Sequence, residues 1–349
     1  MSIFANMKVL KVFLFSFLNL GSIFAQVGGD NTYEFLNLTT SARISALGNV
    51  LVNSYDNDVN LAQQIPSLNH AGMNHQLALN FTNYYAGIKF GSLIYGIPSS
   101  RFENISVGMK YLNYGDFTRT DEFGNVIGTF SAGEYAFYAS TTVYKRASFR
   151  FGTALKAVYS NMEAYNSYGL LGDFSATYEF NQERTFASLL IKNAGFQIKT
   201  YAHESEPMPF EMILGVSSRF EHAPLRWSIS WAHLEKWDLS YTDPTESTVD
   251  PLTNEEIVNN YSTRDKLFSH LHVGGEILFS ENFNIRVGYN FRRRQEMALD
   301  LYKHNVGLSW GFSMKISKFH FNYARAAYHA VGPMHTFSVL TNLSKFRRK

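Results

Sequence analysis

The chain of 349 residues contains no cysteine, which excludes disulfides, thiolate metal sites, cysteine nucleophiles and a lipid-modified N-terminal cysteine. Proline is scarce, at eight residues, as extended strands require. Charged side chains make up 17% of the sequence, below the usual share of about a quarter. After the first 25 residues, no apolar run approaches the ~20 residues that a membrane-spanning helix needs. If the mature chain lies in a membrane, it must therefore cross it as a closed β-barrel.

The first 25 residues resemble a secretory signal peptide. Lys8 and Lys11 precede the apolar stretch Val12–Phe24, and Ala25 is a plausible last residue of the signal. The alternative is a short N-terminal anchor, but a stretch of 13 residues is too short to span a bilayer. Removing the two lysines leaves 29 basic and 29 acidic residues. This balance provides no concentrated basic surface, so no nucleic-acid partner is expected.

What the sequence does contain is apolar and polar residues in strict alternation. Phe283–Arg292, Val306–Lys315 and Leu225–Trp231 all show this period of two, which is typical of strands with two different faces. The polar face carries Arg, Lys, Glu and Gly, which suit a wet interior, while the apolar face suits lipid. A charge should therefore be harmful on the apolar face and milder on the polar face, at Gly307 or Ser309. The residues assigned to lipid are Ile285, Val287, Leu308 and Trp310.

Residues 76–349 contain fourteen strand candidates, and their connections alternate between short and long. The longer ones are Asp116–Gly133, Thr200–Pro209, Thr242–Lys266 and Arg293–His304. Short turns on one side and long loops on the other are typical of outer-membrane barrels. The sequence predicts an all-β fold, a transmembrane antiparallel β-barrel of about 14 strands. The candidates start near Leu77, Ile88, Ile105, Ala136, Phe149, Gly169, Phe186, Phe210, Leu225, Phe268, Phe283, Asn305, Phe319 and His335.

Residues 26–75 lack this alternation and mix small and apolar residues. We interpret them as an N-terminal plug with one short helix near Ser41, capped by Thr39 or Thr40. A disordered leader is the alternative, and the apolar content argues against it. Asp56–Asn60 resembles half of a calcium loop but lacks its Gly and distal Glu, so an Asx-type turn is favoured over a metal site.

Charged residues on the inward phase of the strands are the first candidates for a functional role. They could line a substrate path, or they could pair with each other and with the plug. Pairing is favoured, because charged lumens are ordinary in such barrels. The lumen-lining candidates are Lys110, Arg150, Lys156, Arg219, Arg226, Glu276, Arg286 and Lys315.

Two charged segments on the long-loop side are candidates for binding a partner. The loop 242–266 is the longest and is acidic, and long loops in compact folds are usually functional or disordered. An arginine cluster, where the eleventh strand meets a loop, could grip lipopolysaccharide phosphates or a partner's acids, or could simply be solvated. The candidate residues are Asp243, Glu246, Asp250, Glu255, Glu256, Arg292, Arg293 and Arg294.

No nucleophile elbow, phosphate loop, dinucleotide fingerprint or zinc-protease helix is present, so no cofactor is expected and nothing recommends an enzyme. Several blocks together resemble the PorQ family, outer-membrane barrels of the type IX secretion system of Bacteroidota. They are Tyr33–Leu38, Ser41–Arg43, Ala46–Gly48, Asp56–Ala62, Asn113–Phe117, Gly128–Ala132, Lys192–Gln197, Pro209–Phe210 and His222–Arg226.

This resemblance covers nearly all of the mature chain and implies a fourteen-stranded barrel related to fatty-acid-transporter barrels. It implies a non-enzymatic role in which the barrel holds a PorZ-like surface protein within an attachment complex with PorU-like and PorV-like members. Such a complex processes secreted cargo and links it to lipopolysaccharide. Gln63–Asn69 stands where relatives tend to have Asn-Pro-Ala-Leu, so the turn before the first strand is expected to differ. The alternative function is an outer-membrane transporter or channel for hydrophobic or small solutes.

Overall fold

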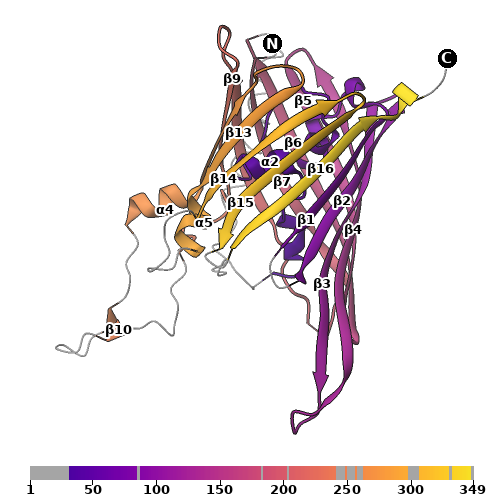
Figure 1. Ribbon diagram of the computed structural model, residues 1–349, viewed down its shortest axis with the longest axis vertical. Helices are drawn as coiled ribbons and strands as arrows, with labels where there is room; N and C mark the ends of the chain where they lie inside the picture. Colours follow the sequence, from indigo (N-terminus) through magenta and orange to yellow (C-terminus); the bar gives the residue numbers. More distant parts are fainter. Residues whose placement is uncertain are drawn as a thin grey trace, which may run out of the picture.

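The computed structural model describes residues 31–84, 87–181, 184–202, 204–240, 248–249, 256–257, 262–297, 306–329 and 332–346. The predicted signal peptide lies outside these residues. Within them, fourteen antiparallel strands close into one barrel, and each strand pairs with its neighbours in sequence order (Figure 1). The barrel closes between β1 (Gln76–Asn83) and β16 (Gly332–Asn342). The predicted fold class is confirmed.

The bounds of the other elements follow the chain. The remaining barrel strands are β2 (Lys89–Ser99), β3 (Glu103–Thr120), β4 (Val126–Arg146), β5 (Phe149–Met162), β6 (Tyr165–Phe180), β7 (Thr185–Lys199), β8 (Glu211–Arg219), β9 (Leu225–Trp231), β12 (Leu271–Ile277), β13 (Phe283–Asn290), β14 (Leu308–Ile316) and β15 (Phe319–His329). Outside the barrel lie the two-residue strands β10 (Thr248–Val249) and β11 (Glu256–Ile257), and the helices α4 (Thr263–Ser269) and α5 (Phe291–Met297).

The predicted strands match the observed ones in number and order, with two corrections. First, β4 begins at Val126 rather than near Ala136, and β3 runs on to Thr120. The predicted loop Asp116–Gly133 is therefore mostly a strand pair with a short turn. Second, Phe268 belongs to α4, because the capping box of Ser262 and Asp265 starts a helix there.

The predicted faces are also observed. Val287 and Trp310 are 50% and 42% exposed on the outer wall, whereas the intervening positions Gly288 and Ser309 face the inside. Small and polar side chains fill the inner face, which is why so many serines and threonines are buried. Among the described residues, no helix is long and apolar enough to cross a membrane.

Residues 31–75, here called the N-terminal segment, lie inside the barrel (Figure 1). The segment carries η2 (Glu34–Asn37), α2 (Ala42–Ala46), α3 (Val59–Gln64), η3 (Pro66–Leu68) and η4 (Ala71–Met73). Helix α2 contacts β13 to β16, α3 contacts β1 to β4, and η3 contacts β4 to β6, so the segment touches much of the circumference.

The segment has its own apolar core, in which Leu47, Leu51, Leu61 and Leu68 are 1% exposed or less. The predicted helix is present, but its N-cap is Ser41 rather than Thr39 or Thr40, because Ser41 is the extended residue that directly precedes the first turn.

Candidate functional site

The inward-facing charges meet the N-terminal segment in a central ion network, defined by Arg43, Asp56, Asp58, Arg226, Glu276 and Arg286. Strand register builds the wall's half of it, because Arg226 on β9 lies opposite Glu276 on β12, which lies opposite Arg286 on β13. Neighbouring strands thus place positive, negative and positive side chains at one level.

Glu276 is the centre of this network, and its side chain is only 1% exposed. Arg43 donates from Nε to Oε1 and from Nη2 to Oε2, both over 3.0 Å. Arg226 donates to Oε2 over 2.9 Å, and Arg286 donates to Oε1 over 2.8 Å. This fork-to-fork geometry gives charge-assisted bonds, the stronger class of hydrogen bond. The N-terminal segment is therefore tied to the wall by a buried ion pair.

The segment supplies two further carboxylates, so that three arginines face three acids. Asp56 accepts from Arg43 over 2.5 Å and from Arg226 over 2.7 Å, and Asp58 lies 3.5 Å from Arg43. Burial alone would raise the pKa of the Asp56 carboxyl, but Arg226 and Arg43 outweigh it and hold that pKa well below its ordinary value. The network is thus balanced in charge and ionised at neutral pH.

Asp58 also accepts a hydrogen bond from the backbone N–H of Asn60 over 3.0 Å and caps α3. The Asx-type turn expected for Asp56–Asn60 is confirmed. Across the described ranges, no three His, Asp or Glu side chains are grouped so that they could hold a metal ion.

Three of the other lumen candidates also make inward contacts. Lys110 donates to the carbonyl of Leu36 over 2.9 Å, and Lys156 pairs with Asp173 over 2.6 Å. Arg150 is 4% exposed and lies 3.6 Å above the ring of Tyr55 in the N-terminal segment. The pairing interpretation of the inward charges is therefore favoured by these contacts.

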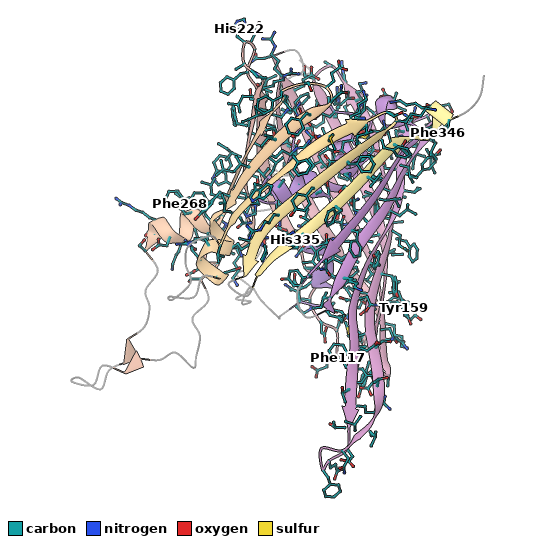
Figure 2. The ribbon with its side chains drawn as sticks, viewed as in Figure 1. Phe117, Tyr159, His222, Phe268, His335 and Phe346 are labelled. Carbon is teal, nitrogen blue, oxygen red and sulfur yellow. The ribbon has the colours of Figure 1, made fainter. Side chains whose placement is uncertain are left out.

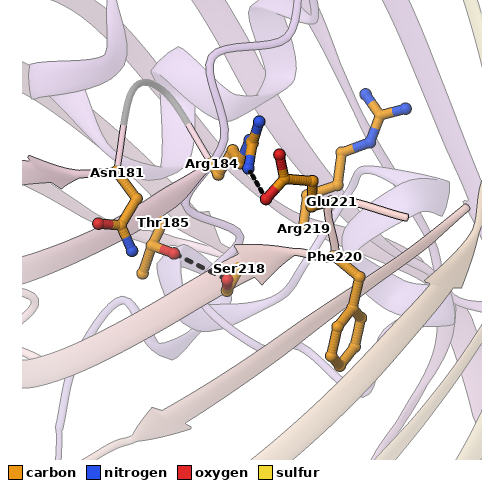
Figure 3. A pocket seen from close by; sticks show the side chains of 7 residues that line it. All are labelled: Asn181, Arg184, Thr185, Ser218, Arg219, Phe220 and Glu221. Atoms are coloured by element: carbon orange, nitrogen blue, oxygen red, sulfur yellow. Dashed lines mark hydrogen bonds and ion pairs between the residues drawn. The ribbon is translucent and has the colours of Figure 1, made fainter. Parts of the chain in front are cut away.

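Two lumen candidates lie at the strand ends instead. Lys315 is half-buried near the end of β14. Arg219 is exposed as the last residue of β8, where it lies opposite Arg226 on β9. It lines an open hollow of about 500 Å³, beside the ion pair between Arg184 and Glu221 (Figure 3). Alternation alone predicted its phase correctly but could not show that the strand ends there.

Hydrogen bonds to the wall hold the backbone of the N-terminal segment on several sides. The wall contributes short hydroxyl side chains, which reach the segment without filling the space it needs. The bonds include Ala42 N–H to Ser338 on β16 (2.9 Å), Leu51 N–H to Ser230 on β9 (3.2 Å), Asn53 N–H to Ser217 on β8 (3.0 Å), Ser67 N–H to Ser175 on β6 (2.8 Å) and Ser309 on β14 to the carbonyl of Ala46 (3.0 Å).

Two glycines mark where the segment touches the wall's backbone. A Cβ atom at Gly288 on β13 would lie 2.0 Å from the carbonyl carbon of Leu47, and one at Gly152 on β5 would lie 2.2 Å from the backbone nitrogen of Ser67. Such approaches leave no room for any side chain. The segment is thus wedged between distant strands.

This close fit argues against the expectation that charge is milder on the polar phase at Gly307 or Ser309. Ser309 is fully buried against the segment, so an arginine there has no space. Gly307 has a φ of +91°, and a Cβ would lie 2.7 Å from the carbonyl oxygen of Asn290. The expectation assumed a hydrated lumen at this level, where the structure has packed protein.

The end of the barrel that carries α4, α5 and the turn between β3 and β4 is here called the loop end. Of the acidic candidates there, Asp243, Glu246, Asp250 and Glu255 lie outside the described residues, and of Glu256 only its place in β11 is described.

The three arginines of the cluster lie on α5, which contacts α4, β12 and β15. Arg292 donates to Glu296 over 2.6 Å and contacts His233, and all three are partly buried. The helix therefore folds onto the barrel.

The most prominent feature of the loop end is one that the sequence analysis missed. Strands β3 and β4 continue past their neighbours as a two-stranded ribbon, residues 116–131, which projects far from the barrel (Figure 1). Figure 2 shows Phe117 on this ribbon and Phe346 at the opposite end of the molecule. The signal that could have found it is Asp121–Asn125, a turn sequence with Gly at its fourth position.

No known family model matches the chain, and no curated protein matches it. Solved structures do. The Pseudomonas putida toluene transporter TodX is 12% identical, with 86% of this chain and 96% of that chain covered and a TM-score of 0.48. The Ralstonia pickettii toluene transporter TbuX is 12% identical, with coverages of 87% and 97% and a TM-score of 0.44. A Pseudomonas aeruginosa FadL homologue is 11% identical, with coverages of 87% and 98% and a TM-score of 0.46. At such similarity, the function of this chain has to be inferred from its own residues.

Proposed function

We propose that this chain is an outer-membrane barrel with a closed lumen, which holds a protein partner at its loop end and catalyses no reaction. The observation that carries the proposal is the N-terminal segment, which is bonded to the inner wall on several sides and tied to it by the central ion network. Because the lumen is occupied in this way, the exposed elements of the loop end are the surface that can bind a partner.

The outer wall supports the membrane location. Its exposed side chains are large and apolar, for example Leu79 at 50%, Phe137 at 54% and Leu155 at 60%. Exposed apolar area on this scale is unfavourable in water and favourable in lipid, and a closed barrel leaves no unpaired backbone in the hydrocarbon layer.

The finer proposal comes from the resemblance to the PorQ family. In this proposal the partner is a PorZ-like surface protein, and the barrel belongs to an attachment complex with PorU-like and PorV-like members. The complex would process type IX cargo and link it to lipopolysaccharide. The absence of any catalytic motif in the sequence supports a holding role over an enzymatic one.

The competing function is transport of hydrophobic or small solutes, and TodX and TbuX are toluene transporters. It requires a path past or around the N-terminal segment. The two functions therefore differ in what the intact barrel lets through.

The test combines permeability with partner capture. Intact barrel in liposomes should admit neither ions nor small polar solutes, while a variant lacking residues 31–74 should conduct ions as an open-barrel control. Affinity purification of the intact barrel from native outer membranes should bring down a surface protein at stoichiometric yield. Deletion of the gene should leave type IX cargo unprocessed. Solute flux through the intact barrel with no retained protein would reject docking in favour of transport.

A further inference from the structure

Among the residues that the structure describes, none pairs with either backbone edge of the ribbon, residues 116–131. Pairing of β2 with β3 stops at Asn113, and pairing of β5 with β4 starts only at Ala132. Between these limits the two strands pair only with each other, Asp116 opposite Ser131 and Arg119 opposite Gly128. Free edges are a template for adding another strand.

The ribbon is nonetheless well ordered. The Asp121 carboxylate accepts from the backbone N–H groups of Phe123 (2.9 Å) and Asn125 (2.8 Å), and Gly124 supplies the φ of +83° that the turn requires. The rings of Phe117 and Phe130 stack with their centroids 5.2 Å apart. The tip is thus held in one shape, which lowers the entropy cost of binding.

The two edges differ in chemistry. The β3 edge carries Asp116 and Arg119, whereas Val126–Ser131 on β4 contains no charged residue and no proline. Natural proteins usually protect a free edge with such residues, and Val126–Ser131 itself carries none. The nearby charges come from other strands, since Arg119, opposite Gly128, pairs with Glu163 after β5. Val126 and Ile127 on this edge, and Phe123 at the tip, are 69%, 60% and 88% exposed.

We propose that the β4 edge, Val126–Ser131, receives an extended segment of a partner protein as a third strand, with Phe123 as an anchor in an apolar pocket of that partner. This inference rests on the proposed docking function and names its binding mode. The occupant is a polypeptide because the edge presents unpaired backbone donors and acceptors, which another strand satisfies and lipid tails do not. The ribbon also projects away from the apolar outer wall, where lipid would lie (Figure 1).

The test uses two substitutions that are matched in chemistry. Thr129 and Thr118 lie directly opposite each other on the ribbon, so they share a face but belong to different edges. Thr129→Lys places a charge on the β4 edge, and Thr118→Lys places the same charge on the β3 edge. A third variant, Phe123→Ser, removes the anchor. Heat-modifiable migration on gels confirms that each barrel is folded.

Tagged full-length barrels are purified from native outer membranes, and the co-purified protein is quantified. Thr129→Lys and Phe123→Ser should each lower retention by about tenfold, while Thr118→Lys retains the partner, since a charged edge opposes strand addition on its own side only. In the wild-type complex, hydrogen exchange at Val126–Ser131 should slow by about tenfold or more relative to the free barrel.

Equal retention by all variants, or unprotected amides along Val126–Ser131, would overturn the strand-addition mode while leaving docking intact. If the wild-type barrel retains no protein, the docking function itself fails and this inference with it. If the captured protein is a second copy of this chain, the edge mediates self-association, and a partner protein is rejected as occupant.

Discussion

Replacing Arg43 by Met should release the N-terminal segment from the barrel wall. Arg43 is the only Arg or Lys in the described range 31–75, and it donates to Glu276, Asp56 and Asp58. Met fills a similar length but donates nothing. Two charges on the wall, Arg226 and Arg286, would then face the acids without their third partner.

The magnitude follows from burial. The Arg43 side chain is 6% exposed and that of Glu276 is 1% exposed, so the pair is shielded from water. Removing one member of a buried ion pair costs about 3–5 kcal/mol, and here it leaves three carboxylates facing two arginines. Each ~1.4 kcal/mol changes an equilibrium tenfold, so the opened population of the segment should rise by roughly 10² to 10³ or more.

The absence of cysteine provides a clean assay. Ser45 on α2 is fully buried and its hydroxyl has no hydrogen-bond partner, so Ser45→Cys is a mild change that installs a single thiol. A maleimide reagent can reach this thiol only when the segment opens. Where opening and closing are faster than labelling, the labelling rate tracks the opened population. We expect labelling to accelerate in the Arg43→Met background by the factor above.

The controls separate this effect from general damage. Arg101→Met makes the same change at an exposed arginine and should leave labelling unchanged. Glu122→Cys, at the tip of the ribbon, should label at one rate in both backgrounds. If Arg43→Met and wild type label equally slowly at position 45, the ion network does not hold the segment and the reasoning is refuted.

Further predictions concern the wall and pH. Val287→Arg, near the bilayer midplane, should lower the free energy of unfolding by ~2–4 kcal/mol, and Ser309→Arg should lower it at least as much despite its polar phase. Urea titration in liposomes measures both changes. A tolerated Ser309→Arg would contradict the filled lumen. Gly288→Val should speed labelling at position 45, whereas Gly332→Val, where nothing lies within 4 Å of the added Cβ, should not. The pKa of Asp56 is lower in the folded chain than the unfolded value of about 4. The stabilisation that its carboxylate gives the folded state is therefore complete above about pH 4 and is lost as pH falls towards the folded pKa. Hydrogen exchange in the segment, corrected for intrinsic rates, should therefore accelerate below about pH 4 in the wild type and by a smaller factor in Asp56→Asn, which retains the other carboxylates of the network.

The strands were predictable because successive residues of a barrel wall face lipid and the polar interior in turn, so apolar and polar side chains alternate. Val287 and Trp310 face outward as alternation predicts, and Glu276 faces inward. The ends were not predictable, since alternation continues past the point where neighbours stop. For this reason the sequence predicts a loop around Phe117, where the structure has the paired strands β3 and β4.

The contacts of the N-terminal segment were predictable only in kind. Inward charges needed partners, and the segment needed a surface, so pairing between them was expected. Which carboxylate meets which arginine depends on register between strands far apart in sequence. Arg43 and Glu276 are separated by 233 positions, and no local pattern links them.

The closure of the barrel between β1 and β16 has a consequence for assembly. The N-terminal segment directly precedes β1, and its helix α2 contacts β16 and bonds to Ser338. The part of the chain that is made early therefore waits for the last strand before it can complete its contacts. Until then its leucine core has no enclosing wall, and its arginine has no buried carboxylate on β12. The barrel and the N-terminal segment therefore complete their contacts together, and the pairing of β16 with β1 that closes the wall also encloses the segment.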